Sequence, residues 1–262
     1  MDRIEAGRYW DENAPVWTRL ARAGCDIYRD YVNTPAFLAM LPDVSGLTGL
    51  DIGCGEGHNT RLLAGRGARM AGIDISPTFI AAARQAGADD PRGVEFRVAD
   101  ACELPFEDRS FDFATAFMSL MDMPDARPAL REARRVLTPD GFCQFSISHP
   151  CTNTPHRRLI RDEDGRERAL EIGGYFDPPS GRVDEWIFTG APPELREGLR
   201  RFRVPFLHRT LSWWLNAVVD AGLVIERVNE PRADDRAARE CPKVADTRLV
   251  PYFLHVRCRR AE

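Results

Sequence analysis

The sequence lacks the features that mark secreted, membrane-spanning and metal-bound proteins. It contains one lysine, Lys243, and its seven cysteines include no pair with the CxxC spacing of zinc knuckles or thioredoxin-type motifs. We therefore expect reduced thiols. No apolar run approaches the 18 residues of a transmembrane helix, and the first ten residues lack the apolar core of a signal peptide. These absences predict a cytoplasmic protein with neither a membrane segment nor a metal site.

A strong excess of one charge is also lacking. The chain has 36 basic and 40 acidic residues and a net charge of −4, which gives no electrostatic reason to expect a nucleic-acid partner. Neither an internal repeat nor a low-complexity segment is present. With 44% hydrophobic residues, the composition is ordinary for a packed globular protein, and residues 1–262 fit a single domain. The sequence carries no signal for oligomeric state.

Short apolar runs alternate with helical patterns through most of the chain. This alternation predicts a parallel sheet with helices on both faces. The last two strands have no predicted helix between them, only an irregular charged loop at 231–250, so they are expected to pair antiparallel at the edge. The predicted strands are 49–52, 69–73, 94–99, 111–117, 142–147, 224–229 and 252–257. The predicted helices are 59–64, 78–86, 126–137, which a turn signal at 138–141 ends, and 210–221.

Two segments lie outside the alternation. Residues 1–41 carry helical patterning with several aromatic residues and are expected to form an N-terminal cap. Residues 149–209 are rich in proline, glycine and charge, with short possible strands at 174–176 and 185–188. A stretch of this length is too long for an ordinary connection, so it predicts an insertion that forms a lid or binds substrate.

A glycine-rich turn joins the first predicted strand to the first helix of the alternation. It reads Asp51-Ile52-Gly53-Cys54-Gly55-Glu56-Gly57, and its glycines allow a ligand to approach the backbone closely. The dinucleotide fingerprint GxGxxG fails, because His58 stands at its third glycine. A Walker loop needs a Gly-Lys-Ser/Thr ending, which is absent here.

The turn resembles motif I of class I S-adenosylmethionine (SAM)-dependent methyltransferases, D/E-x-G-x-G-x-G. Two further acids fall where that family has them: Asp74 at the end of the second strand and Asp100 at the end of the third. As an alternative to cofactor binding, either aspartate could simply cap the helix that follows it. The order of turn and acids favours SAM binding, and the resemblance implies that Asp74 accepts the ribose hydroxyls and Asp100 the adenine amino group. The resemblance to this family extends through residues 104–112 and 132–141 and is strong over residues 48–147.

The resemblance implies a Rossmann-like sheet of seven strands, mostly parallel with an antiparallel last strand, and SAM as the cofactor. The flanks are similar to a bacterial group of methyltransferases, type 11-like, that act on small molecules and whose N-terminal helices close over SAM. Segments that carry this likeness are 9–11 with Trp17, 26–29, 59–61, 117–122, 148–150 and 208–211. The candidate cofactor-binding residues are Asp51, Gly53, Cys54, Gly55, Asp74, Ile75, Asp100, Ala101 and Phe117.

Methyl transfer is an in-line displacement that depends on aligning the nucleophile with the methyl group. A base is needed only where the nucleophile must lose a proton. His149 and His208 bracket the insertion and are the candidate bases. Each could instead have a structural role: His149 as a residue of the turn before Pro150, and His208 as a polar contact near the start of the following helix. Tyr175, Trp186 and Trp213 are candidate substrate contacts, with packing as the alternative.

These patterns predict an enzyme that methylates an O, N or C nucleophile of a small molecule. Two alternatives stay open. One is an RNA-modifying methyltransferase. The Asn/Asp-Pro-Pro-aromatic motif of amino-methylating DNA enzymes is absent at 117–120, which disfavours that subclass. The other is a SAM-binding protein that transfers no methyl group, such as a cyclase, a decarboxylase or a regulatory partner.

Overall fold

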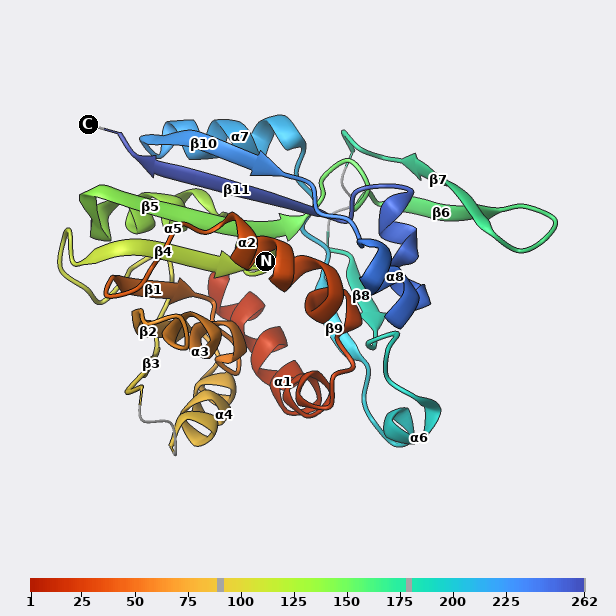
Figure 1. Cartoon of the computed structure of the whole chain (residues 1–262), viewed down its shortest axis with the longest axis horizontal. Coiled ribbons are helices and arrows are strands. Elements are labelled where there is room, and N and C mark those ends of the chain that lie inside the picture. The colour runs from red at the N-terminus through yellow and green to blue at the C-terminus, as the bar shows by residue number, and fades with distance from the viewer. Residues whose placement is uncertain (89–91, 178–180, 262) are drawn as a thin grey trace.

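A seven-stranded mixed sheet forms the centre of the molecule in the computed structural model, which describes residues 1–88, 92–177 and 181–261 (Figure 1). The strand order is β3-β2-β1-β4-β5-β11-β10. Strands β3 to β5 run parallel, and β11 is antiparallel to both of its neighbours, β5 and β10. This confirms the predicted sheet with its antiparallel last strand. The strands are β1 (Thr48–Ile52), β2 (Arg69–Asp74), β3 (Glu95–Val98), β4 (Phe111–Phe117), β5 (Leu137–Ser148), β10 (Leu223–Asn229) and β11 (Phe253–Arg260).

Side chains that alternate along the strands build an apolar core on each face of the sheet. On one face, Leu50 and Ala114 belong to a buried cluster with α5 and α7. On the other face, Phe113 packs in a cluster with α2 and α3, while α4 contacts β2 and β3. Helices therefore cover both faces, as the alternation predicts. The helices of this region are α2 (Thr34–Met40), α3 (His58–Ala64), α4 (Pro77–Gly87), α5 (Arg127–Val136) and α7 (Leu211–Asp220).

Two sequence predictions near the sheet need correction. The segment 231–250, expected to be irregular, contains α8 (Asp235–Glu240) and a 3-10 helix, η3 (Pro242–Arg248). The signal was Asp234, whose carboxylate caps α8 by accepting the amide of Ala237 at 2.7 Å. The turn predicted at 138–141 is instead the irregular start of β5, because β4 pairs with this part of the chain through a register shift.

The N-terminal segment is helical, as its pattern predicts. It contains α1 (Arg3–Arg22), a π-helix, η1 (Arg29–Asn33), and then α2. In Figure 1, α1 lies beside the carboxyl ends of the parallel strands. No helix in the described ranges 1–88, 92–177 and 181–261 is both long enough and apolar enough to cross a membrane.

The insertion contains two antiparallel strand pairs. β6 (His156–Arg161) and β7 (Glu167–Gly173) form a hairpin that projects from the body of the molecule (Figure 1). β8 (Val183–Trp186) pairs with β9 (Phe202–Pro205), and α6 (Pro193–Arg196) lies between them in sequence.

The strand expected at 174–176 is wrong, since β7 ends at Gly173 and Gly174 has a left-handed φ of 71°. The strand expected at 185–188 is present as β8, two residues earlier in the chain.

Asn13 joins the insertion to the N-terminal segment. Its side-chain amide donates to the carbonyl of Arg203 at 2.9 Å, and its side-chain oxygen accepts the amide of Arg203 at 3.0 Å. The side chain of Asn13 thus binds β9 as a neighbouring strand would, and Asn13 is 3% exposed. A buried amide with both groups satisfied fixes α1 against β9 in one position.

Candidate functional site

The glycine-rich turn presents bare backbone at the carboxyl end of β1. Gly53, Gly55 and Gly57 all have positive φ, at 70°, 54° and 81°. A Cβ at Gly55 would meet no atom within 4 Å, so this residue faces open space. The amide of Cys54 donates to the carbonyl of Ile73 at 2.8 Å and ties the turn to β2. A ligand can therefore approach the turn at Gly55 without meeting a side chain there.

Replacing Gly53 with alanine is expected to destabilise the protein by about 2–4 kcal/mol, from left-handed strain and overpacking. The new Cβ would lie 2.3 Å from the Cβ of Ser119. Urea unfolding measures the loss. Gly46→Ala is the matched control, because Gly46 has a φ of 78° but open space around its Cβ. An equal loss in both variants would show that the contact with Ser119 contributes nothing.

Asp51 forms the buried base of the turn. Its two carboxylate oxygens accept the hydroxyl protons of Thr60 at 2.6 Å and Thr115 at 2.9 Å. Burial raises the pKa of the carboxyl to about 6, against the lowering effect of these two hydrogen bonds. Asp51 thereby connects β1 with α3 and β4 at the point where the turn begins.

Asp74 and Asp100 lie at the ends of the next two strands, as predicted. The carboxylate of Asp74 accepts the amides of Gly55 and Ser76, each at 2.9 Å, and burial raises its pKa to about 6. Asp100 accepts the amide of Cys102 and one guanidinium nitrogen of Arg3, each at 2.8 Å. Both carboxylates line the same cavity as the turn.

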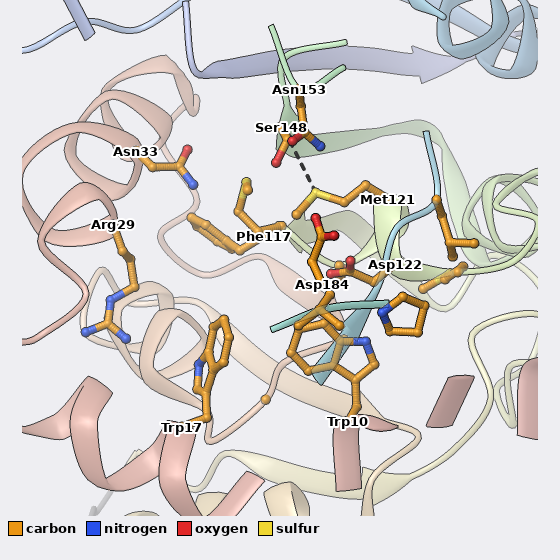
Figure 2. Close-up of a pocket in the computed structure, with 18 of the residues that line it drawn as sticks. Trp10, Trp17, Arg29, Asn33, Phe117, Met121, Asp122, Ser148, Asn153 and Asp184 are labelled. Atoms are coloured by element: carbon orange, nitrogen blue, oxygen red, sulfur yellow. Dashed lines mark hydrogen bonds between the residues drawn. The ribbon is translucent and has the colours of Figure 1, made fainter. Parts of the chain in front are cut away.

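This cavity has a volume of about 1010 Å³ and runs from the turn to the insertion. All of the residues predicted to bind the cofactor line it. Of the other candidates, Trp186 and His208 line it, whereas His149, Tyr175 and Trp213 do not. Figure 2 shows part of the opposite wall, where side chains of α1, the end of β4 and the insertion surround the space.

His149 is buried outside the cavity lining, and both of its ring nitrogens have partners. Nε2 lies 2.7 Å from a carboxylate oxygen of Glu230, and Nδ1 accepts the amide of Cys151 at 3.2 Å. The accepting Nδ1 places the proton of the neutral ring on Nε2, where it is donated to Glu230. Neither nitrogen is directed at the cavity, so the base role of this residue remains a prediction with no contact to support it.

His208 borders the cavity, but its ring nitrogens face backbone carbonyls. Nδ1 lies 3.1 Å from the carbonyl of Asn153 and Nε2 lies 2.9 Å from the carbonyl of Tyr175. A neutral ring donates its one N–H to one of these carbonyls, and the lone pair of the other nitrogen is directed at the second carbonyl, so neither nitrogen is aimed at a substrate in the cavity. The ring holds the two ends of the insertion together, and its role as a base also remains a prediction.

The two other aromatic candidates take part in packing. The hydroxyl oxygen of Tyr175 accepts the amide of Leu211 at 2.7 Å at the start of α7. Trp213 stacks with the guanidinium of Arg209, 4.7 Å from the ring centroid. Its neighbour Trp214 lines the cavity instead. Helix periodicity alone could not decide which of two adjacent indoles faces inwards.

Several lining residues were not predicted as site residues. Asp122 lies five residues after the end of β4, and an acid shortly after a strand end was the available signal. Trp10 and Trp17 come from α1, and Asp184 from β8. Sequence alone gave no means of bringing these distant segments to one cavity. In the described part of the chain, no three His, Cys, Asp or Glu side chains are grouped to hold a metal ion.

Comparisons with known proteins agree with this geometry. A family model described as a methyltransferase domain matches residues 50–145. The chain is 32% identical to a structurally characterised S-adenosylmethionine-dependent methyltransferase from Mesorhizobium loti, covering 86% of this chain and 96% of that one with a TM-score of 0.70.

Curated relatives match over shorter stretches. An O-methyltransferase of Penicillium expansum is 44% identical over 40% of this chain. A demethylmenaquinone methyltransferase of Clavibacter sepedonicus is 40% identical over 45% of it. The chain spans only 41% and 46% of the lengths of these two relatives.

Proposed function

Because this chain belongs to the class I SAM-dependent methyltransferases, we propose that it methylates a small molecule held in the cavity between the glycine-rich turn, α1 and the insertion. The observation that carries the proposal is the cavity itself. Pockets for single small ligands span about 300–1,000 Å³. A cavity of about 1010 Å³ is about three times the lower end of this range, which leaves room for a small acceptor beside the cofactor.

The residues around the turn fit SAM. Asp74 offers carboxylate oxygens that only backbone amides now contact, and Gly55 leaves open space beside them. One oxygen of Asp100 is held by Arg3 of α1, so an adenine amino group would meet this carboxylate beneath α1. When bound, SAM supplies a methyl group on a positively charged sulfur. The role of the protein is to hold the acceptor in line with that methyl group and to exclude water.

The position of α1 supports an enclosed acceptor. Asp11 accepts the hydroxyl of Ser76 at 2.6 Å, and Arg22 donates to Glu56 at 3.2 Å. With the pair of Arg3 and Asp100, these contacts pin α1 along the cofactor end of the cavity. Together with the hydrogen bonds of Asn13 to β9, they place α1 over the cavity between the cofactor end and the insertion.

The net charge of −4 and the demethylmenaquinone methyltransferase among the relatives also support a small acceptor over a nucleic acid. Panels of phenols, amines, carbon acids and RNA, each incubated with SAM and the protein, test the proposal. We expect S-adenosylhomocysteine (SAH) to form with at least one class of small molecule. SAH formed only with RNA would contradict it.

Binding of SAH is expected to protect residues 1–30 and the insertion, 149–209, from proteolysis, since α1 contacts both the cofactor end of the cavity and β9. Limited proteolysis with and without SAH, read by mass spectrometry, measures this. Cleavage in α5, which packs on β5 and α7, serves as the internal control. Unchanged cleavage in both segments would show that they do not close over the ligand.

A further inference from the structure

Asp122 lies at the cavity edge of the sheet, close in the chain to residues that contact the turn. It ends the 3-10 helix η2 (Leu120–Asp122), which is separated from the end of β4 by two residues. β4 pairs with β1 in parallel, and the hydroxyl of Ser119 donates to the carbonyl of Ile52 at 2.6 Å. These contacts bring the segment after β4 to the glycine-rich turn. Figure 2 shows the side chain of Asp122 in the cavity near Met121 and Trp10.

The carboxylate of Asp122 has no hydrogen-bond donor among the described residues. Arg209 is the nearby cation, but its guanidinium donates to the carbonyls of Met121, Met123 and Pro124 at 3.3, 2.6 and 2.6 Å. Arg209 therefore offsets the charge of Asp122 without satisfying its oxygens. Asp122 is half-buried in the cavity lining, so its carboxylate can meet a ligand there without first losing a hydrogen bond to the protein.

The other acids of the cavity differ from Asp122 in this respect. In the described chain each of them accepts a hydrogen bond or forms an ion pair. The partners are Arg29 for Asp26, Thr60 and Thr115 for Asp51, Arg22 and Arg61 for Glu56, Gly55 and Ser76 for Asp74, Arg3 and Cys102 for Asp100, Arg182 for Asp184, Arg203 for Glu185, and Tyr28 and Tyr252 for Asp246. Asp122 thus has carboxylate oxygens free to meet a ligand.

We propose that Asp122 is the general base of the reaction and that the acceptor is a hydroxyl or amine carried on an apolar skeleton. The inference rests on the methyl transfer proposed above. The O–H or N–H of the acceptor donates to the carboxylate of Asp122, which takes the proton as the nucleophile forms its bond to the methyl carbon. The methyl–sulfur bond breaks and its electron pair stays on the sulfur, so that the leaving group is neutral SAH. The proton from the acceptor remains on the carboxyl group of Asp122. Met121, Trp10 and Trp214 supply the apolar wall around this position.

The electrostatics of the site suit this role. Burial raises the pKa of Asp122 to about 8, and Arg209 opposes part of that rise. The other charged groups nearby are paired with one another: Asp125 with Arg127, and Asp184 with Arg182 across the cavity. A base whose pKa lies near neutral pH is well matched to proton transfer.

A first experiment compares Asp122→Asn with the wild type by urea unfolding between pH 4 and 9. Because the folded pKa is raised, the wild type loses stability as pH rises from about 4 to 8, while the asparagine variant does not. Above pH 8 the unfolding equilibrium constant of the variant should be at least about tenfold below that of the wild type. A destabilised variant would show that Asp122 has a structural partner and would overturn the proposal.

A second experiment measures transfer from SAM to a panel of phenols and primary amines, including catechol and benzylamine. For any member that the wild type methylates, Asp122→Asn should lower kcat by about 10²- to 10⁴-fold and abolish the rise in rate as pH passes through about 8. SAH affinity should stay within twofold. Asp125→Asn, an adjacent acid outside the cavity lining, is the matched control and should keep the wild-type profile.

The outcomes separate the two proposals. A wild type that binds SAH but methylates no small molecule removes the proposed function, and the base assignment with it. A wild type that methylates a panel member, together with an asparagine variant that keeps its rate and pH profile, removes only the base assignment.

Discussion

Asp74→Ala is expected to weaken the binding of SAM and SAH about a hundredfold. The carboxylate stands at the end of β2 with its oxygens oriented by the amides of Gly55 and Ser76. Two ribose hydroxyls that donate to this carboxylate would lose charge-assisted hydrogen bonds, and the amide of Gly55 would lose its acceptor. A combined loss of about 3 kcal/mol corresponds to that change in affinity.

Calorimetric titration with SAH measures the effect. Asp43→Ala is the matched control, because Asp43 is exposed and accepts the amide of the nearby Ser45, at 2.9 Å. Its affinity should match that of the wild type. Equal affinity of the Asp74 variant and the wild type would contradict the assignment of this carboxylate to the ribose.

The same carboxylate predicts the pH dependence of binding. Its pKa is raised to about 6 by burial, so the free protein increasingly carries a neutral carboxyl as pH falls through 6. Hydroxyl donors favour the ionised form, which means that the wild type should bind SAH more weakly at pH 5 than at pH 8. Asp74→Ala should lose this part of the pH dependence.

The sheet and its cofactor end could be predicted because their signals are local. A buried parallel strand needs a run of apolar residues, and each strand here is followed within a few residues by a turn, a glycine or an acid. Gly53 and Gly55 have positive φ, which few other residues adopt, so their spacing identifies the turn directly. Asp74 and Asp100 come after consecutive strands of a parallel sheet, and topology then places them at one edge.

The acceptor end could not be predicted because it depends on contacts between distant segments. The strands of the insertion carry charges on both faces, so β6 and β7 have no clear period of two. His149 and His208 were singled out by residue type and position. Their nitrogens instead meet Glu230, Cys151 and two carbonyls, which no local pattern indicates. Asp122 was visible in the sequence, but only the absence of a partner in three dimensions distinguishes it.

Trp17→Ala is expected to separate α1 from the insertion and to destabilise the protein by about 2–4 kcal/mol. Its ring lies at the centre of an aromatic cluster, with ring centroids 5.3 Å from Trp10, 5.5 Å from Trp186, 4.7 Å from Phe188 and 4.8 Å from Phe202. Trp10 belongs to α1 and the other three to the insertion. Removing the indole therefore removes the aromatic contacts between α1 and these residues of the insertion.

Urea unfolding and amide hydrogen exchange measure the two effects of Trp17→Ala. Exchange should rise in α1 and in β8 and β9, and stay unchanged in β4 at the centre of the sheet. Phe176→Ala is the matched control: Phe176 is also an aromatic residue of the insertion, but it is 80% exposed, so its loss should change stability by about 0.5 kcal/mol or less. A loss of stability without faster exchange in β8 and β9 would show that the cluster supports α1 alone. Faster exchange in both segments would instead indicate that the cap and the insertion close the cavity as one unit, since the ring of Trp17 connects α1 with β8 and β9 through Trp186 and Phe202.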